Sequence, residues 1–167
     1  MSPLRRALPL VLLATLLAGC GWHLRGANSA SLTGHTLAVD SRLRTVDVRA
    51  TLIRGLRTAG ASVIEERGQA DAALVLLDEV VQRRVLANDP GSRVQEVEVN
   101  YVLRYALERP DGEALAPADS VSVSEVYRAD RDNVLSGQAQ EARVVERLRQ
   151  DAVRVLLPRV QAALKRR

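Results

Sequence analysis

The residue with the most distinctive chemical setting is Cys20, the only cysteine of the chain, which ends an apolar run. Arg5 and Arg6 precede that run, and small residues lie just before the thiol. A basic start, an apolar core and small residues at the cut are typical of an export signal. A nucleophilic thiol at the cut indicates, in addition, that its sulfur carries lipid. We therefore expect a signal peptide over residues 1–19 and lipidation of Cys20.

Two other interpretations of this run fit less well. A membrane-spanning helix needs roughly 20 apolar residues, but Pro9 interrupts the run and Gly19 ends it. A plain secretory signal has no need for a cysteine at that place. Acyl chains contribute about 0.8 kcal/mol per buried methylene, so two or three chains hold a protein at a bilayer. Gly21 is not the aspartate that resembles an inner-membrane retention signal, so we expect the outer membrane, with the protein facing the periplasm.

The rest of the chain offers no set of side chains arranged for catalysis. It has no Gly-x-Ser-x-Gly elbow and no phosphate-binding glycine loop. Glu96 and Glu98 share a strand face, as a glycosidase pair does, but they alternate with valines on a face predicted to meet water. The two histidines, His23 and His35, have no metal-ligating neighbours at the required spacing. We expect no enzyme, no cofactor and no metal site.

Composition predicts one domain without a polycationic surface. Removal of the signal leaves the usual size of a single domain, about 100 to 200 residues. The precursor has 24 basic and 20 acidic side chains, and two of the basic ones leave with the signal, so nucleic acid is not an expected partner. After Leu24 the chain is small and polar up to Gly34. We expect a lipidated tether over 20–34 and a single domain over 35–167.

Hydrophobic spacing predicts the first elements of this domain. Alternation predicts a short strand over 35–40. Apolar residues at three- and four-residue steps then predict an amphipathic helix over 42–59, ended by Gly60. A second short strand is predicted over 61–65. This order permits a right-handed parallel crossover.

Longer strands are predicted next. Residues 72–86 form a long, mostly apolar segment, and Asn-Asp-Pro-Gly-Ser at 88–92 predicts a turn. Strict alternation over 97–107 predicts a strand with one buried face and one mostly wet face. Pro-Asp-Gly at 110–112 turns the chain again into an antiparallel strand over 121–127.

The last part of the chain is predicted to be helical. Apolar residues from Val134 to Leu157, Leu135 and Val155 among them, recur at helical spacing, with charged residues around the other side. Pro158 cannot donate the helical hydrogen bond and is expected to end or kink the helix. The resulting order, β-α-β-β-β-β-α, predicts an α+β two-layer sandwich, in which two helices pack on one face of a four- or five-stranded mixed sheet.

The start of the predicted mature chain resembles a known family. Residues 20–25, Cys-Gly-Trp-His-Leu-Arg, followed by a short tether and a body of this size and order, are similar to the LptE lipoproteins of lipopolysaccharide assembly in Gram-negative outer membranes. A tryptophan and a histidine directly after a lipidated cysteine have no generic role, although such rings also suit the headgroup level of a membrane. The resemblance implies a plug inside the LptD β-barrel that assists barrel assembly and binds lipopolysaccharide.

The resemblance also implies roles for particular basic residues. The family's basic residue between two long strands corresponds to Arg93, whose guanidinium suits lipid A phosphates. The alternative for Arg93 is a hairpin-tip charge in water. The family's second basic position falls on Ser-Gly-Gln at 136–138, so Arg128 and Arg131 are the nearby candidates for lipopolysaccharide binding.

Two other functions compete with a role in lipopolysaccharide assembly. An envelope tether or scaffold lipoprotein would bind peptidoglycan or a periplasmic protein, with no lipid ligand. A hydrolase acting at the membrane is a third class, but no carboxylate of the sequence is poised for it. A polar surface of mixed sign suits a barrel interior, yet it also suits any periplasmic domain. Copurified partners therefore decide among these functions.

Overall fold

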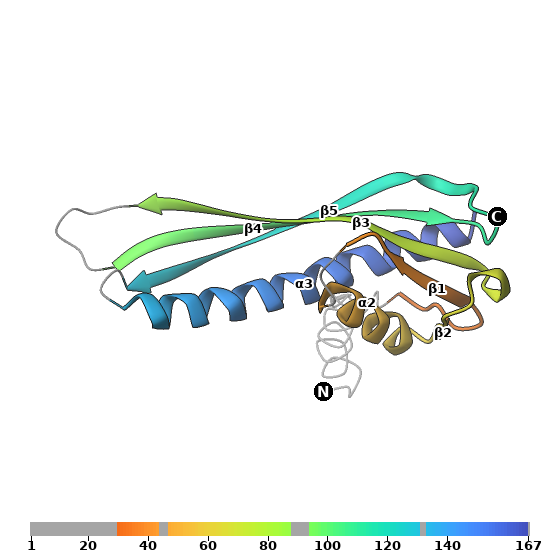
Figure 1. Cartoon of the computed structure of the whole chain (residues 1–167), viewed down its shortest axis with the longest axis horizontal. Helices are drawn as coiled ribbons and strands as arrows, with labels where there is room; N and C mark the ends of the chain where they lie inside the picture. The colour runs from red at the N-terminus through yellow and green to blue at the C-terminus, as the bar shows by residue number, and fades with distance from the viewer. Residues whose placement is uncertain (1–29, 44–46, 88–93, 131–132, 167) are drawn as a thin grey trace, which may run out of the picture.

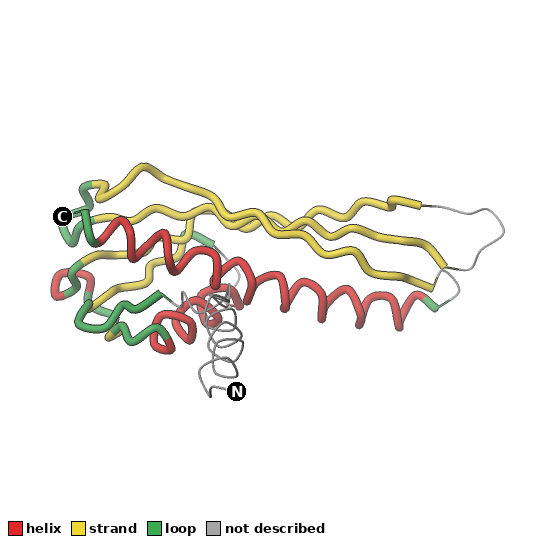
Figure 2. Tube along the Cα trace, turned by 180° about the vertical axis from the view of Figure 1, so that it is seen from behind, coloured by secondary structure: helices red, strands yellow, loops and turns green. Residues whose placement is uncertain are grey.

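The computed structural model describes residues 30–43, 47–87, 94–130 and 133–166. The elements are β1 (Thr36–Ser41), α2 (Asp47–Thr58), β2 (Ser62–Ile64), the 3-10 turn η1 (Arg67–Gln69), β3 (Ala72–Ala87), β4 (Val94–Glu108), β5 (Ala114–Asp130) and α3 (Val134–Leu164). The strands form one five-stranded sheet in the order β2-β1-β3-β4-β5. Both helices lie on the same side of it (Figure 1, Figure 2). The predicted α+β sandwich is confirmed.

The sheet has a short parallel part and a long antiparallel part. β1 pairs in parallel with β2 and β3, whereas β3, β4 and β5 pair antiparallel. The last three strands have 16, 15 and 17 residues and therefore extend far beyond β1 and β2 (Figure 1). We call this extension, residues 78–87, 94–104, 120–130 and 134–151, the arm. We call the rest of the described chain the base.

Alternation along β4 positions the core as predicted. Every second side chain from Val97 to Leu107 is buried, at 5% exposure or less. These residues face α3, and their register partners on β5 include the buried Val121 and Tyr127. The side chains between them point to the opposite face, which the helices leave uncovered. That face is the one available to a partner.

Gly60 ends α2 as the sequence predicts. Its φ of 92° lies in the left-handed region, where a side chain would be strained. The Gly60 N–H donates to Arg57 O and the Ala61 N–H donates to Leu56 O, both at 3.0 Å. This pair of bonds is the Schellman motif. It turns the chain directly from α2 into β2.

The predicted start of α2 at residue 42 is wrong. The N–H of Arg42 donates to Leu76 O of β3 at 3.0 Å, and the N–H of Leu43 donates to the Ser41 hydroxyl. Leu43 fits the helical spacing, but the backbone pairing to β3 continues past β1 and holds these residues in an extended path. The helix therefore begins later, at Asp47.

Of the two outcomes predicted for Pro158, an end or a kink of the last helix, the first is wrong, because α3 continues to Leu164. Proline removes one backbone hydrogen bond, but the apolar stripe continues beyond it. Val160 and Leu164 are 1% and 3% exposed. Their burial against the base offsets the lost bond, so the helix persists.

Packing begins within the segment predicted to be a tether. Leu32 is fully buried, and its N–H donates to Ala59 O at 2.7 Å. The turn predicted at 88–92 lies outside the described residues. No helix in the described ranges combines the length and apolar character needed to cross a membrane.

Candidate functional site

Of the four residues predicted to carry or contact lipid, the structure describes one. Cys20, Arg93 and Arg131 lie outside the described residues. Arg128 lies near the far end of β5 on the uncovered sheet face, and 78% of its side chain is exposed. Its Nε is 3.5 Å from Oε1 of Glu96 on β4. The guanidinium therefore remains accessible to an anionic ligand.

Arg128 lies close to the end of the described β4–β5 ladder. The last pair of this ladder joins Val94, the first residue of β4, to Asp130, the last residue of β5. Arg128 therefore lies two residues from the end of the described strand.

Exposed aliphatic side chains also lie at this end. Leu86 at the end of β3 and Val94 at the start of β4 are each 45% exposed, and Leu135 in the first turn of α3 is 80% exposed. We call Leu86, Val94, Arg128 and Leu135 the tip. The prediction that Leu135 belongs to the covered apolar stripe of α3 is wrong, because most of its surface is exposed. Aliphatic groups beside a guanidinium suit an amphipathic anion.

Polar contacts fix the start of α3 to the sheet. The Tyr127 hydroxyl donates to Glu141 Oε2 at 2.9 Å, and Arg83 Nε lies 3.3 Å from the same oxygen. From residue 135 to 143 no side chain is buried, and Val144 is the first that is. Burial and the bond to Glu141 raise the pKa of the Tyr127 hydroxyl. The Glu141 carboxylate therefore holds the first turns of α3 against both β3 and β5.

A buried ion pair crosses from β3 to α3 in the middle of the arm. Arg149 Nε is 2.8 Å from Glu79 Oε1, and the two side chains are 16% and 6% exposed. Tyr101 is fully buried, and its hydroxyl has no hydrogen-bond partner among the described atoms. Burial and the charge of Glu79 raise the pKa of this hydroxyl far above its ordinary value. The acid is ion-paired and the phenol stays protonated, so the cluster braces helix to sheet and supplies no base.

A second polar cluster lies at the junction of base and arm. Asp119 accepts hydrogen bonds from Arg159 at 2.8 Å and from the Tyr105 hydroxyl at 3.1 Å. The backbone N–H of Ser120 and the Arg159 guanidinium hold the pKa of Asp119 below its ordinary value. Burial raises the pKa of Tyr105 to about 12. These groups join α3 to the edge strand β5.

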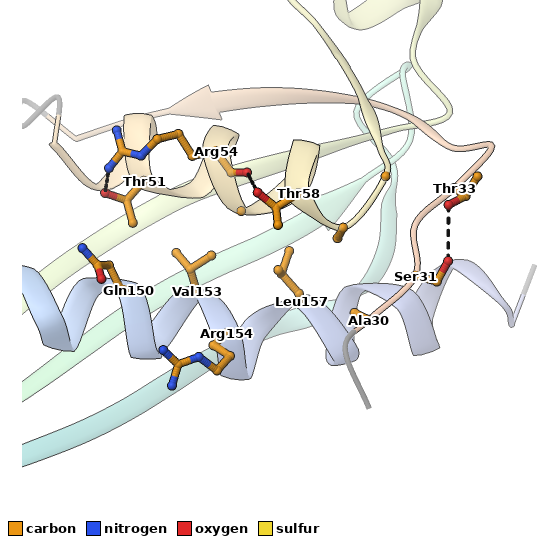
Figure 3. A pocket seen from close by; sticks show the side chains of 13 residues that line it. Ala30, Ser31, Thr33, Thr51, Arg54, Thr58, Gln150, Val153, Arg154 and Leu157 are labelled. Atoms are coloured by element: carbon orange, nitrogen blue, oxygen red, sulfur yellow. Dashed lines mark hydrogen bonds between the residues drawn. The ribbon is translucent and has the colours of Figure 1, made fainter. Parts of the chain in front are cut away.

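A groove of about 940 Å³ lies between α2 and α3 (Figure 3). Its lining includes the small or apolar residues Gly55, Ala59 and Leu157, with Arg54 and Arg154 among the polar ones. The helices approach closely at Gly55, where a Cβ would be 2.5 Å from Val153 Cγ1. The groove is therefore a consequence of small residues along α2.

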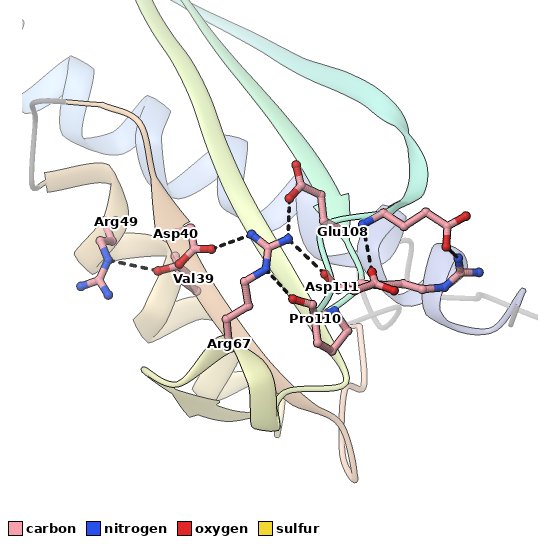
Figure 4. A network of polar contacts seen from close by, with 9 residues as sticks. Val39, Asp40, Arg49, Arg67, Glu108, Pro110 and Asp111 are labelled. Carbon is pink, nitrogen blue, oxygen red and sulfur yellow. Dashed lines mark hydrogen bonds and ion pairs between the residues drawn. The ribbon is translucent and has the colours of Figure 1, made fainter.

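Arg67 of η1 ties the base together (Figure 4). Its guanidinium binds Glu108 at 2.6 Å, Asp40 at 3.0 Å and the backbone carbonyls of Arg109 and Pro110. The bond to Glu108 raises the pKa of Arg67. One side chain thus connects β1 to the β4–β5 turn. It has a structural role, because its donors are used within the chain.

The described residues include no group of three or more His, Cys, Asp or Glu side chains placed to hold a metal ion. The arrangement that remains is an arm with a polar outer face and a tip that combines exposed aliphatic side chains with Arg128.

Comparison with known proteins agrees with this description. The family model described as "LptE: Lipopolysaccharide-assembly" matches residues 34–160. The chain belongs to the LptE family. No curated protein matches the sequence. The predicted resemblance to this family is confirmed. The matched range does not include residues 20–25, so the body of the chain supports the family independently of them. Membership places this LptE-family chain among lipopolysaccharide-assembly lipoproteins, which are not enzymes.

Solved structures share the LptE fold. Lipoprotein B from Nitrosomonas europaea superposes with a TM-score of 0.67 at 21% identity, over 85% of this chain and 91% of that one. A minor lipoprotein from Acinetobacter baumannii gives 0.65 at 17% identity, over 77% and 91%. Rare lipoprotein B from Shewanella oneidensis gives 0.63 at 18% identity, over 78% and 96%. The long arm is therefore part of a fold seen in other lipoproteins.

Sequence reasoning missed the apolar part of the tip and the Glu141 contacts. Leu86 and Val94 flank the predicted turn, and this position was the available signal for their exposure. The contacts of Glu141 with Arg83 and Tyr127 join three elements far apart in the chain. No local spacing connects such residues.

Proposed function

We propose that this LptE-family chain is an outer-membrane lipoprotein anchored through lipid on Cys20. In this proposal its arm lies as a plug within the LptD barrel, assists barrel assembly, and binds lipopolysaccharide at the tip during its insertion into the outer leaflet. Family membership supports a role in lipopolysaccharide assembly. The observation that carries the proposal is the arm, which projects from the base with one face free of helices (Figure 1).

The free face of the arm has the character of a surface that meets a polar lumen. Its side chains mix both signs of charge with serines and amides, and the interior of a large membrane barrel is polar. The members are Asp78, Val80, Gln82 and Arg84 on β3, Glu96, Glu98, Asn100, Val102 and Arg104 on β4, and Ser120, Ser122, Ser124, Val126 and Arg128 on β5.

The tip supports the lipopolysaccharide part of the proposal. Arg128 is exposed there, and the chain neighbours of Arg93 and Arg131 are paired at the same end. Guanidinium groups form bidentate bonds with phosphate. Exposed Leu86 and Leu135 add aliphatic surface. Together they match a ligand with phosphates next to acyl chains.

Affinity purification of the tagged protein from detergent-solubilised outer membranes tests the plug. We expect a stoichiometric β-barrel of large mass to copurify. Retention on cell-wall sacculi without that barrel would instead support a scaffold that binds peptidoglycan. Cys20→Ala should leave the body folded but release it from the membrane, and unchanged membrane retention would contradict the lipid anchor.

Paired charge reversals test the tip. Arg93→Glu with Arg128→Glu should weaken lipopolysaccharide binding about tenfold or more, which is about 1.4 kcal/mol. Arg104→Glu is the matched control, because Arg104 is exposed on the same face but far from the tip. Equal loss in both proteins would mean a general charge effect and would remove the tip from the site.

A further inference from the structure

β3 has an open edge along the arm. β1 pairs with β3 only over Ala72–Leu76, and no described residue pairs with that side of β3 from Asp78 onward. Figure 1 shows β3 as the outermost strand of the arm, while α3 packs on β4 and β5. An open edge presents a row of N–H and C=O groups to any strand that approaches. The arm therefore has a place for one more strand.

The sequence along this edge is complementary to itself. Residues 78–84 read Asp-Glu-Val-Val-Gln-Arg-Arg, with acids at one end, bases at the other and Val81 at the centre. Antiparallel pairing of two copies about Val81 places Asp78 opposite Arg84. Glu79 and Arg83 are also opposite each other in this register, but each stays bound to α3. Parallel in-register pairing places like charges side by side, which is unfavourable. We propose that the free edge of β3 pairs antiparallel with the same edge of a second copy of this chain.

Exposure along the edge agrees with this register. Val81 is 43% exposed although it points to the same face as the buried Tyr101, its register partner on β4. In the pair, the two Val81 side chains meet and cover each other. Arg84 is 72% exposed and binds Glu98, and its five N–H donors serve a second carboxylate as well. Asp78 lies on the outer face in line with Arg84 and completes that pair.

The length of the free edge limits the pairing. A strand paired about Val81 places residue 84 opposite Asp78, whereas Leu86 falls opposite Leu76, which β1 already pairs, so the two copies pair only up to residue 85. At Leu76 the pairing of β1 with β3 ends, and a register shift in the β3–β4 ladder separates Leu76 from Asp78. A single strand pair buries less than the roughly 1,200 Å² of a stable interface. The dimer is therefore weak and depends on concentration.

Single-cysteine cross-linking tests the pairing, and its outcome is independent of the lipopolysaccharide role. The whole chain with Cys20→Ser has no cysteine, so Val81→Cys adds one thiol. Directly opposite residues of paired strands have Cβ atoms about 4.5–5.5 Å apart, near the span of a disulfide. Val126→Cys is the control, because Val126 is 50% exposed but lies on β5, away from the edge. We expect mild oxidation to form disulfide dimer about tenfold faster at residue 81.

Charge reversal decides the register. Asp78→Arg in the Val81→Cys protein places two arginines together at both ends of the pair and should slow cross-linking about tenfold. Adding Arg84→Asp exchanges the charges and should restore it, with thermal unfolding confirming that every variant is folded. Equal cross-linking at residues 81 and 126, or no response to Asp78→Arg, overturns the proposal.

Discussion

The base and the arm hold a helix on a sheet in different ways. In the base, α2 and the second half of α3 cover the sheet with aliphatic side chains, and Leu52, Leu56 and Leu156 are fully buried. In the arm α3 covers the sheet alone, and the side chains of β3 that face the helix layer include Glu79 and Arg83. Apolar burial therefore stabilises the base, while the arm adds ion pairs to a thinner core.

Apolar burial in the base and ion pairs in the arm have different effects on stability and on geometry. Hydrophobic burial has no preferred direction and contributes in proportion to the area removed from water. Ion pairs and tyrosine hydrogen bonds fix a geometry but contribute little net free energy when they are partly exposed. A base of the first kind keeps the chain folded. In the arm, these directional contacts fix α3 on the sheet while the opposite, polar face stays uncovered.

Leu56→Ala gives the largest expected effect. Leu56 is fully buried in the base, and its truncation removes apolar burial and leaves a cavity, at a cost of about 3 kcal/mol in the free energy of unfolding. Urea unfolding measures it. Leu135→Ala is the matched control in the arm, because that leucine is 80% exposed and its truncation should cost less than about 0.5 kcal/mol. Equal costs would contradict the division into base and arm.

Glu79→Gln should lower the free energy of unfolding by less than Leu56→Ala does, but by more than any other change to an ion pair in the arm. It leaves the mostly buried Arg149 without its nearest carboxylate, and Glu146 at 3.6 Å relieves part of the loss. We expect about 2 kcal/mol in urea unfolding. Glu98→Gln breaks the Arg84 pair, which is 72% exposed on the arginine side, and should cost at most about 0.5 kcal/mol. A larger loss in Glu98→Gln would show that burial does not set the order.

Local patterns predicted the strands and their buried faces better than they predicted the contacts between elements. Strict alternation along β4 identified its buried face because one face meets α3 and the other meets water. β5 begins at Ala114, earlier than the predicted residue 121, because Pro117 lies where the register with β4 shifts and needs no ladder bond. The contacts of Glu141 and Arg149 depend on tertiary placement. Hydrophobic periodicity carries no information about which charged side chains form ion pairs with each other.

The candidate site shows the same limit. The family resemblance pointed to three arginines, of which the structure describes Arg128, exposed near the end of β5. Leu135 has the spacing of a core residue, yet it is 80% exposed. Exposure of an apolar residue depends on which elements pack against it, and the spacing within a single helix does not encode that.

Glu141→Gln should loosen the tip without unfolding the base. The carboxylate binds Arg83 and Tyr127 together, and its neutralisation should cost about 1 kcal/mol locally. Hydrogen exchange should quicken at the start of α3, where no side chain from residue 135 to 143 is buried, while amides of α2 keep their protection. Uniform acceleration across both helices would mean that base and arm unfold as one unit.

The smallest expected effect concerns ionisation of the tyrosine hydroxyls, which does not change the stability of the protein at neutral pH. All three tyrosines have a raised pKa, chiefly from burial, to about 12 for Tyr105. A raised phenol pKa means that the stability it contributes is complete below the ordinary value of 10.0 and is lost as pH rises through the folded value. Absorbance titration of single Tyr→Phe variants assigns each step. We expect Tyr127 near the tip, which is 7% exposed, to ionise before Tyr101, which is fully buried. The reverse order would place the better-shielded part of the arm at the tip and would contradict the thinning of the core toward that end.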